Sequence, residues 1–312
     1  MTKRVLFLVG PTGSGKTQLS LCLAKRLGAE ILSADSMLVY RGMDIGTAKP
    51  SREDRKRVRH HLIDLVSPRR NFSVSEHREL ALEAIESILK RGRLPLVVGG
   101  SGLYVSAIWK GLSPHPGTNM KLREKLNQLV KEKGLEDLYQ ELERVDPHRA
   151  KQIHPNDRRR ILRALEIVHT SGKTPSEWYQ KRTSLGDLGY SVKVIGVARD
   201  RRDLYDRINL RVESMFRKGL LREVERLKQR GFSKTARQAL GYREVLDSKG
   251  TRPFLKELIQ QRTRQFAKRQ LTWFRREKDI HWVRWERDEA VGRVCGKMIT
   301  EIRKWLENES SL

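Results

Sequence analysis

Short apolar runs alternate with segments of helical period over much of the chain. The run at residues 5–9 has the length of a strand, and after it Leu19, Cys22, Leu23 and Leu27 recur at three- and four-residue spacing, as on the buried face of a helix. Further strands are predicted at residues 30–35, 94–100 and 191–198, and a helix at residues 72–91. This alternation predicts a parallel α/β sheet with helices on both faces.

The pattern changes between residues 118 and 190, where no segment resembles a strand. Three segments of helical period fill this part of the chain, at residues 120–134, 135–145 and 157–172. We therefore expect residues 1–117 and 191–312 to form the α/β core and residues 118–190 to form an inserted all-helical domain. From residue 201 to the end, the chain is again expected to be helical and basic.

The octapeptide GPTGSGKT at residues 10–17 matches the P-loop pattern G-x-x-x-x-G-K-[ST] and lies between the first predicted strand and helix. In this setting the loop N–H groups and the helix N-terminus bind phosphates, Lys16 reaches them, and the Thr17 hydroxyl can ligate Mg²⁺. The expected fold is therefore a P-loop NTPase-like sheet, with Mg²⁺ as cofactor. The predicted diphosphate-binding residues are Gly10, Pro11, Thr12, Gly13, Ser14, Gly15, Lys16 and Thr17.

Two other polar clusters lie at the ends of predicted strands, one with Asp35 at the tip of the strand at residues 30–35 and the other in the turn GGSG at residues 99–102. Because ligands gather at the carboxyl ends of parallel strands, these clusters are expected to meet the P-loop. Asp35 could instead be a turn residue, and the GGSG segment a simple tight turn. The apolar strands at 94–100 and 191–198 lack the terminal aspartate that holds Mg²⁺ in ATP-hydrolysing P-loop proteins. Asp35 could fill that role, but its strand is less apolar than is usual, and the pattern favours a diphosphate that leaves over a triphosphate that is hydrolysed.

The charge adds a partner to this picture. Lys and Arg number 65 against 38 Asp and Glu, a net charge of +27, which indicates nucleic acid or an anionic membrane surface, although a generally basic surface is the simpler alternative. No apolar stretch approaches the roughly 20 residues of a membrane span, and the first apolar run is too short for a signal peptide. We expect a cytoplasmic protein that spans no membrane. Cys22 and Cys295 predict neither a disulfide framework nor a metal site.

Two stretches concentrate the basic residues. Arg159 and Arg163 lie one helical turn apart, opposite Ile161 and Leu165, and a polyanion would offset their mutual repulsion. In the second stretch, Ile259, Phe266 and Trp273 form an apolar stripe interpreted as core, and six cations lie elsewhere on the same helix without an acidic neighbour: Arg262, Arg264, Lys268, Arg269, Arg275 and Arg276. These cations favour phosphate contacts over a merely solvated face.

With these residues assembled, the chain resembles the bacterial members of the tRNA isopentenyltransferase family, the tRNA dimethylallyltransferases, over almost its whole length. The motifs that carry the resemblance, in order, are GPTGSGKT, SADSMLVYRGMDIGTAKP, HHLID, FSVSEH, LVVGGSGLYV, IHPNDRRRILRALEI, QALGYREVL and TRQFAKRQLTWFR. Departures are small, such as Ser101 where relatives usually have threonine.

The resemblance implies that the P-loop holds the diphosphate of dimethylallyl diphosphate and that N6 of the adenine 3′ of the tRNA anticodon is the acceptor. It implies Asp35 as the base for that amine, with Lys16 and Ser101 as further catalytic residues. It places in contact with tRNA the residues Asp35, Ser36, Met37, Leu38 and Ser101, the segment Gln238, Ala239, Leu240, Gly241, Tyr242 and Arg243, and, in the insertion against the anticodon stem-loop, Arg159, Arg160, Ile161, Leu162 and Arg163.

Two alternatives stay open at this point. A P-loop kinase of a nucleotide or nucleic-acid substrate would share the phosphate cradle and the sheet, but it would not need so basic a C-terminal half. An RNA-binding module that uses its P-loop only as a nucleotide switch would leave Asp35 without a role. We expect an enzyme that acts as a monomer.

Overall fold

The computed structural model describes residues 2–308 and divides into two compact units. The core unit comprises the described residues up to Trp109 and from Leu185 onward, and the insertion unit is Lys110–Ser184. Every regular element of the insertion unit is a helix. Within residues 2–308, no helix is both long enough and apolar enough to cross a membrane.

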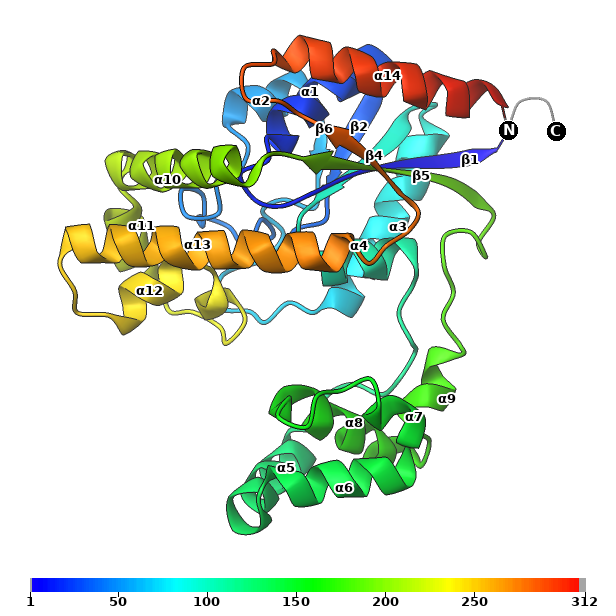
Figure 1. The fold of residues 1–312 in the computed structure, drawn as a ribbon, viewed down its shortest axis with the longest axis vertical. Helices are drawn as coiled ribbons and strands as arrows, with labels where there is room; N and C mark the ends of the chain where they lie inside the picture. Colours follow the sequence, from blue (N-terminus) through cyan, green and yellow to red (C-terminus); the bar gives the residue numbers. More distant parts are fainter. Residues whose placement is uncertain (1, 309–312) are drawn as a thin grey trace. The chain divides into compact units, whose positions relative to one another are not determined.

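The core unit is built on a six-stranded, all-parallel sheet in the order β3-β2-β4-β1-β5-β6 (Figure 1). The strands are β1 (Lys3–Val9), β2 (Ala29–Ser33), β3 (His60–His61), β4 (Leu94–Gly99), β5 (Tyr190–Ala198) and β6 (Ile280–Arg284). The central strand β1 is buried on both faces from Val5 to Val9, as a parallel strand covered by helices should be. The predicted parallel α/β sheet is confirmed.

Two edge strands escaped the sequence prediction. β3 has only two residues, His60 and His61, too few to show a period. β6 lies in a stretch expected to be helical, and only Ile280 and Val283 of it are buried, so charged and half-exposed neighbours interrupt the alternation. The expectation that the chain is purely helical after residue 201 is therefore wrong.

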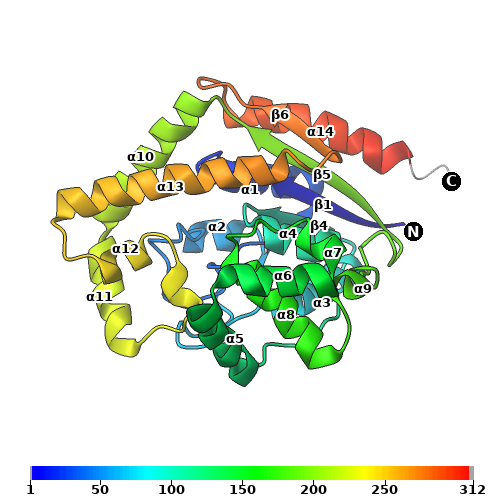
Figure 2. The same cartoon turned by 60° about the horizontal axis from the view of Figure 1, so that its bottom comes forward.

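Helices cover both faces of the sheet (Figures 1 and 2). One apolar layer joins α1 (Lys16–Leu27) and α14 (Val291–Asn308) to side chains such as Leu6, Leu8 and Ile195. The opposite layer joins α3 (Val74–Lys90) and α4 (Gly102–Trp109) to alternate residues of the same strands, such as Phe7 and Val194. This alternation along β1 and β5 follows from the two-residue period of a strand.

Within the first layer, Cys22 of α1 and Cys295 of α14 form a disulfide, with their Cα atoms 6.4 Å apart. The sequence prediction of no disulfide is therefore wrong. The two residues are separated by 273 positions, and the pattern of residues around each gave no sign that their helices pack together.

A second group of helices extends the core unit beyond the sheet. It contains α10 (Arg201–Lys218), α11 (Leu220–Arg230), the short helix η1 (Ala236–Gln238), α12 (Tyr242–Asp247) and α13 (Arg252–Phe274). Asp200 caps the start of α10 by accepting hydrogen bonds from two backbone N–H groups, as an N-cap aspartate does. These helices pack against the loop after β2 through residues such as Tyr40, Met43 and Phe216, and that loop also carries α2 (Arg52–Arg57).

The insertion unit contains α5 (Met120–Lys133), α6 (Leu135–Val145), α7 (Pro147–Ala150), α8 (Arg158–Ser171) and α9 (Pro175–Tyr179). It starts and ends a few residues earlier than the predicted span 118–190. The observed start lies before residue 118 because the Arg163 guanidinium donates to the carbonyls of Pro116 and Gly117. These hydrogen bonds attach the loop before α5 to the insertion unit. The end moves because Leu185 is fully buried in the core unit, where its N–H donates to the Trp109 carbonyl at 2.9 Å.

Candidate active site

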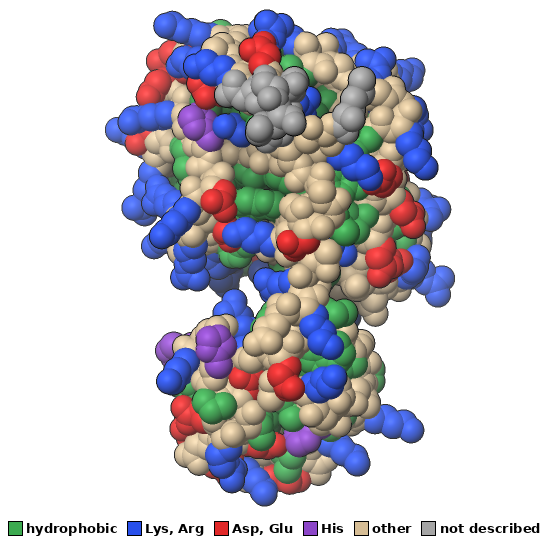
Figure 3. Space-filling view, turned by 90° about the vertical axis from the view of Figure 1, so that its right-hand side faces the viewer, with side chains coloured by type: hydrophobic (Ala, Val, Ile, Leu, Met, Phe, Trp, Pro, Cys, Tyr) green, Lys and Arg blue, Asp and Glu red, His purple; other side chains and the backbone are tan. Residues whose placement is uncertain are grey.

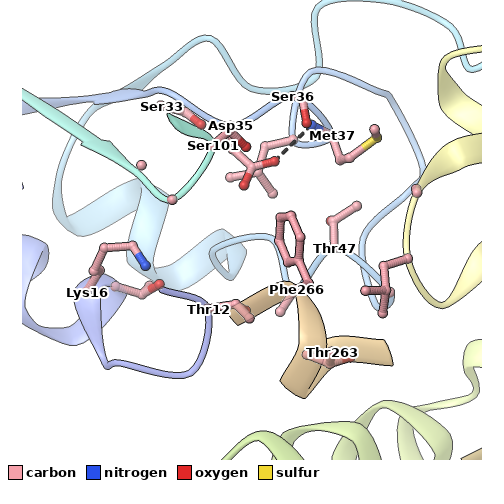
Figure 4. A pocket seen from close by; sticks show the side chains of 18 of the residues that line it. Thr12, Lys16, Ser33, Asp35, Ser36, Met37, Thr47, Ser101, Thr263 and Phe266 are labelled. Carbon is pink, nitrogen blue, oxygen red and sulfur yellow. Dashed lines mark hydrogen bonds between the residues drawn. The ribbon is translucent and has the colours of Figure 1, made fainter. Parts of the chain in front are cut away.

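A cavity of about 390 Å³ opens at the carboxyl ends of β1, β2 and β4. Lys16 and Thr12 of the P-loop face it from one side and Asp35 and Ser101 from the other, with the Phe266 ring between them (Figure 4). The three polar clusters predicted to converge therefore do so, and all of the lining residues belong to the core unit.

The P-loop is held from outside by side chains of distant segments. Gly15 has φ 95°, and Trp285 lies so close behind it that a Cβ there would overlap the indole ring. Arg199 donates to the Ser14 carbonyl at 2.9 Å, and its guanidinium stacks 3.8 Å from the centre of the Trp285 ring. Arg207 donates to the Gly13 carbonyl at 3.0 Å. These contacts hold the backbone of the loop in place, and N–H groups held in place are a condition for strong electrostatic binding.

Lys16 is the charged group of the P-loop that lines the cavity. Its Nζ donates to the Pro11 carbonyl at 2.7 Å. Burial, and then the nearby Arg211 guanidinium, lower the pKa of Lys16 to about 7, while the Asp35 carboxylate works in the opposite direction. A bound diphosphate would stabilise the charged form of Lys16 and raise that pKa again. Thr17, at the start of α1, lines the same wall.

Asp35 follows β2 by two residues, and its Oδ1 accepts the Met37 N–H at 2.8 Å. The turn role considered as the alternative is thus present, because an aspartate that bonds the backbone two residues on is a common turn device. The same carboxylate also faces the cavity (Figure 4). Its position therefore leaves a carboxylate oxygen for a ligand.

The helices beyond residue 200 supply lining residues that the sequence analysis did not assign to the site. Arg211 of α10 is such a residue; it donates to the Thr47 carbonyl at 3.2 Å, and burial lowers its pKa. The spacing of Ile259, Phe266 and Trp273 predicts that Phe266 belongs to the core. This prediction is wrong for Phe266, because its ring is half-buried and lines the cavity. Thr263, Arg269 and Gln270 of α13 line it as well.

The charges around the cavity are strongly unbalanced. Among the residues that line the cavity, all of which fall within residues 2–308, Asp35 is the one carboxylate. Four basic side chains also line the cavity, Lys16, Arg211, Arg243 and Arg269, and Arg243 is paired with Glu244 at 2.7 Å. Even with that pair counted, the positive charge exceeds the negative charge around the cavity, which suits a ligand that brings several negative charges.

The QALGYR segment, residues 238–243, contributes only in part. Gln238, Ala239, Leu240 and Arg243 line the cavity, whereas Tyr242 is fully buried. The Tyr242 hydroxyl donates to Glu223 at 2.5 Å, and burial raises its pKa. The Tyr242 side chain therefore supports the segment from inside the protein, and a contact of this segment with tRNA stays a prediction.

Glu223 organises the loop that faces this segment. Its carboxylate, itself buried, accepts the N–H groups of Asp44, Ile45 and Gly46 at 3.0 to 3.2 Å. The next residue, Thr47, lines the cavity and provides the carbonyl bound by Arg211. Glu223 thus fixes one wall of the cavity without touching it.

In the insertion unit, the residues predicted to bind tRNA separate into three groups. Arg159 and Arg160 are exposed on α8. Ile161 and Leu162 pack in the core of the unit with exposed fractions of 0% and 6%, so their side chains stabilise the unit, and a contact of these two residues with tRNA stays a prediction. The Arg163 guanidinium is bound by Glu166 and by the carbonyls of residues 116 and 117, which gives it a structural role.

Basic side chains also mark the surface at large. On the face shown in Figure 3, Lys and Arg side chains protrude over much of the surface, with fewer acidic ones among them. The net charge of +27 is thus carried outside the cavity as well as around it.

Comparison with known proteins gives a consistent result. A model of a family described as IPP transferase matches residues 38–277. A tRNA dimethylallyltransferase of Acetivibrio thermocellus is 44% identical over 285 residues, which cover 89% of this chain and 91% of the relative. A tRNA dimethylallyltransferase of Bacillus anthracis is also 44% identical, with 99% of this chain and 97% of the relative covered.

Solved structures agree with the sequence relatives. The tRNA isopentenylpyrophosphate transferase of Bacillus halodurans is 39% identical and superposes with a TM-score of 0.73, over 99% of this chain and 98% of that one. A eukaryotic dimethylallyltransferase described as acting on tRNA is 28% identical, with a TM-score of 0.72 over 91% of this chain and 74% of that one. From the match of the family model and the extent of these similarities, the chain belongs to the IPP transferase family.

Proposed function

We propose that the protein transfers the dimethylallyl group of dimethylallyl diphosphate to N6 of the adenine 3′ of the anticodon in tRNA and releases diphosphate. The observation that carries the proposal is the cavity in which a preformed P-loop faces a single carboxylate, Asp35, across a basic wall. The names of the relatives, tRNA dimethylallyltransferases, indicate the dimethylallyl group and tRNA, and the resemblance of the sequence motifs implies the diphosphate donor and the adenine N6.

The P-loop side would bind the donor. Ionisation of an allylic carbon bonded to diphosphate is favoured when the leaving charge is neutralised, and Lys16 and Arg211 are the cations placed for this. Thr17 would hold Mg²⁺ together with the phosphate oxygens, and the ion would help to neutralise them. The residues fit such an ion, since Mg²⁺ at phosphates needs few protein ligands and the Thr17 hydroxyl lines the wall.

The Asp35 side would receive the acceptor. The bond from N6 to the allylic carbon forms while the bond from that carbon to the diphosphate oxygen breaks, and the amine becomes acidic as the new bond forms. Asp35 accepts the proton, and the Ser101 hydroxyl lines the wall beside it to orient the amine. A base stacked in an anticodon loop must leave the stack to reach this cavity, at a cost of a few kcal/mol.

The kinase alternative is not favoured by the structure. β4 ends at Gly99 and β5 at Ala198, so neither neighbour of β1 ends in an aspartate for nucleotide-bound Mg²⁺. The decisive experiment incubates the protein with unmodified tRNA and either dimethylallyl diphosphate or ATP, and then determines the mass of the RNA. We expect a gain of one C5H8 unit with the prenyl donor and none with ATP. Phosphorylated RNA, or rapid RNA-dependent ATP hydrolysis, would support the kinase instead.

We further propose that the insertion unit grips the anticodon stem-loop through exposed cations of α8. Replacement of Arg159 by alanine should weaken tRNA binding and reduce the slope of log K against log salt by about one if one phosphate contact is lost. Lys133→Ala, the same charge change at an exposed position of α5, is the control and should change the slope less. Equal slopes in wild type and Arg159→Ala would place Arg159 outside the interface.

The oligomeric state and the location are proposed as well. The P-loop and Asp35 of the same chain line the cavity, and we propose that a monomer is the active form. Because the proposed substrate is tRNA, we place the protein in the cytoplasm.

A further inference from the structure

We infer that Gln270 is a positioning residue. It holds the donor-binding P-loop and the GGSG turn, which carries Ser101, at a fixed distance from each other, so that the donor carbon and the acceptor amine meet in a reactive geometry. The inference rests on the proposed function and extends it to a residue of α13 that lies 258 positions after Thr12 and 170 positions after Gly100.

The Gln270 side chain makes one hydrogen bond to each loop. Its Oε1 accepts the Thr12 N–H at 2.9 Å, and its Nε2 donates to the Gly100 carbonyl at 2.7 Å. Only an amide of this length provides both a donor and an acceptor here, because a carboxylate lacks the donor and an ammonium lacks the acceptor. Gln270 is 6% exposed, so water competes little for either bond.

The two loops that Gln270 joins are packed against each other. A Cβ added at Gly100 would lie 2.7 Å from the Gln270 Nε2 and 3.0 Å from the Gly10 carbonyl oxygen. The GGSG turn therefore depends on glycine at this point for close contact with the P-loop. Gln270, on α13, bonds to both loops where they meet, and it also lines the cavity.

The bridge connects the two halves of the proposed reaction. Beyond Thr12, the P-loop continues to Lys16, which would hold the donor, and beyond Gly100 the chain continues to Ser101, which would orient the amine. The Thr12 N–H donates to Gln270. This part of the loop therefore helps to position the P-loop relative to the GGSG turn, and other groups of the loop bind the phosphates. Misplacement of reacting atoms by about 1 Å can lower a rate by roughly 10²-fold, which makes such a bridge important for turnover.

Two substitutions separate the two bonds. Gln270→Glu keeps the oxygen that accepts the Thr12 N–H but places an oxygen where Nε2 faces the Gly100 carbonyl. Gln270→Met keeps the approximate length and loses both bonds. Gln261→Glu and Gln261→Met make the same changes at an exposed position of α13 and serve as controls, with the thermal midpoint of each variant measured to verify folding.

The first measurement needs no substrate. Hydrogen–deuterium exchange of the Thr12 amide in the ligand-free protein should be slow in the wild type and in Gln270→Glu and fast in Gln270→Met. The second measurement is the single-turnover rate of prenyl transfer with both substrates saturating. It should fall by about 10- to 100-fold in both Gln270 variants. In the uncharged Gln270→Met variant the dissociation constants for pyrophosphate alone and tRNA alone should stay within threefold, and the Gln261 variants should behave as wild type.

The outcomes are distinguishable from failure of the proposed function. If the wild type transfers no prenyl group, the proposed function fails, and the bridge is then judged by exchange: equal Thr12 exchange in wild type and Gln270→Met overturns it. If the wild type transfers the group and the Gln270 variants match its single-turnover rate, the positioning role is overturned. A loss of pyrophosphate affinity in Gln270→Met as large as its loss of rate would also overturn it, because Gln270 would then only shape the phosphate site.

Discussion

Replacement of Asp35 by asparagine should lower kcat for prenyl transfer by about 10²- to 10⁴-fold, the loss typical of a general base. Asparagine keeps the shape of the side chain and an oxygen that can accept the Met37 N–H, the bond that Asp35 makes at 2.8 Å. It cannot take up the proton that leaves the acceptor amine. The turn after β2 should therefore persist while the chemical step slows.

Binding of the two substrates should change little in the same variant. A group that acts on the reacting amine contributes more in the transition state than in the ground state, so the affinities for tRNA and for the donor should stay within a few-fold. The measurement is a single-turnover assay next to equilibrium binding of each substrate. Asp288→Asn, at an exposed position of the core unit, is the control and should match the wild type.

A near wild-type rate in Asp35→Asn would show that the proton leaves by another group or by water. Asp35 would then be only the turn residue that its bond to Met37 indicates. A large loss of tRNA affinity with an unchanged single-turnover rate would instead make Asp35 a contact for the bound base. Either result would remove the general base from the proposed mechanism and leave donor activation by the P-loop intact.

Local sequence predicted the half of the site that is built by strand ends. The P-loop, Asp35 and Ser101 each follow an apolar strand directly, and parallel strands present their carboxyl ends at one edge. Both the residue type and the place could thus be inferred without knowledge of the packing. The structure brings all three clusters to one cavity.

The half built by helices could not be inferred in this way. Arg211, Arg269 and Gln270 lie on α10 and α13, whose polar residues point in several directions, and only the packing of these helices selects the ones that meet the strand ends. The polar residues Thr263 and Gln270 of α13 are buried and line the cavity, and the apolar Phe266, which is only half-buried, lines it with them. Hydrophobic periodicity favours the opposite assignment.

The predicted tRNA contacts of α8 show how far a basic motif can be read from the sequence. Ile161 and Leu162 lie within the basic motif, although helical period places Ile161 opposite Arg159. The structure follows the period and buries both apolar residues. A motif taken as a continuous segment therefore overstates the contacts of a helix, since only one face can meet a ligand.

Replacement of Lys16 by alanine should weaken donor binding and slow turnover together. Lys16 is the P-loop cation that lines the cavity, and hydrogen bonds to charged groups contribute about 1.5 to 3 kcal/mol, or about 10- to 100-fold in affinity. Pyrophosphate should compete with the donor in the wild type and bind the variant correspondingly less tightly. Lys25→Ala, at an exposed position of α1, is the control. Unchanged pyrophosphate affinity in Lys16→Ala would mean that the diphosphate lies elsewhere.

The lowered pKa of Lys16 adds a pH dependence with a definite sign. Burial and Arg211 bring this pKa to about 7 in the ligand-free protein, so the side chain is charged below pH 7 and loses its proton above it. A bound diphosphate favours the charged form and raises the pKa. Binding must therefore take up a proton above pH 7, and wild-type affinity should fall there by up to about tenfold per pH unit.

Lys16→Arg separates this effect from the ionisation of the ligand itself. Arginine stays charged over the whole range, so the ratio of wild-type to Lys16→Arg affinity for pyrophosphate cancels the part of the pH dependence that belongs to pyrophosphate. That ratio should be constant below pH 7 and fall as the pH rises from 7 to 9. Calorimetry of the wild type in two buffers of different ionisation enthalpy should show uptake of close to one additional proton at pH 8 relative to Lys16→Arg. A ratio that is flat across this range would show that Lys16 is already fully charged in the ligand-free site, and that Asp35 outweighs burial and Arg211 in setting its pKa.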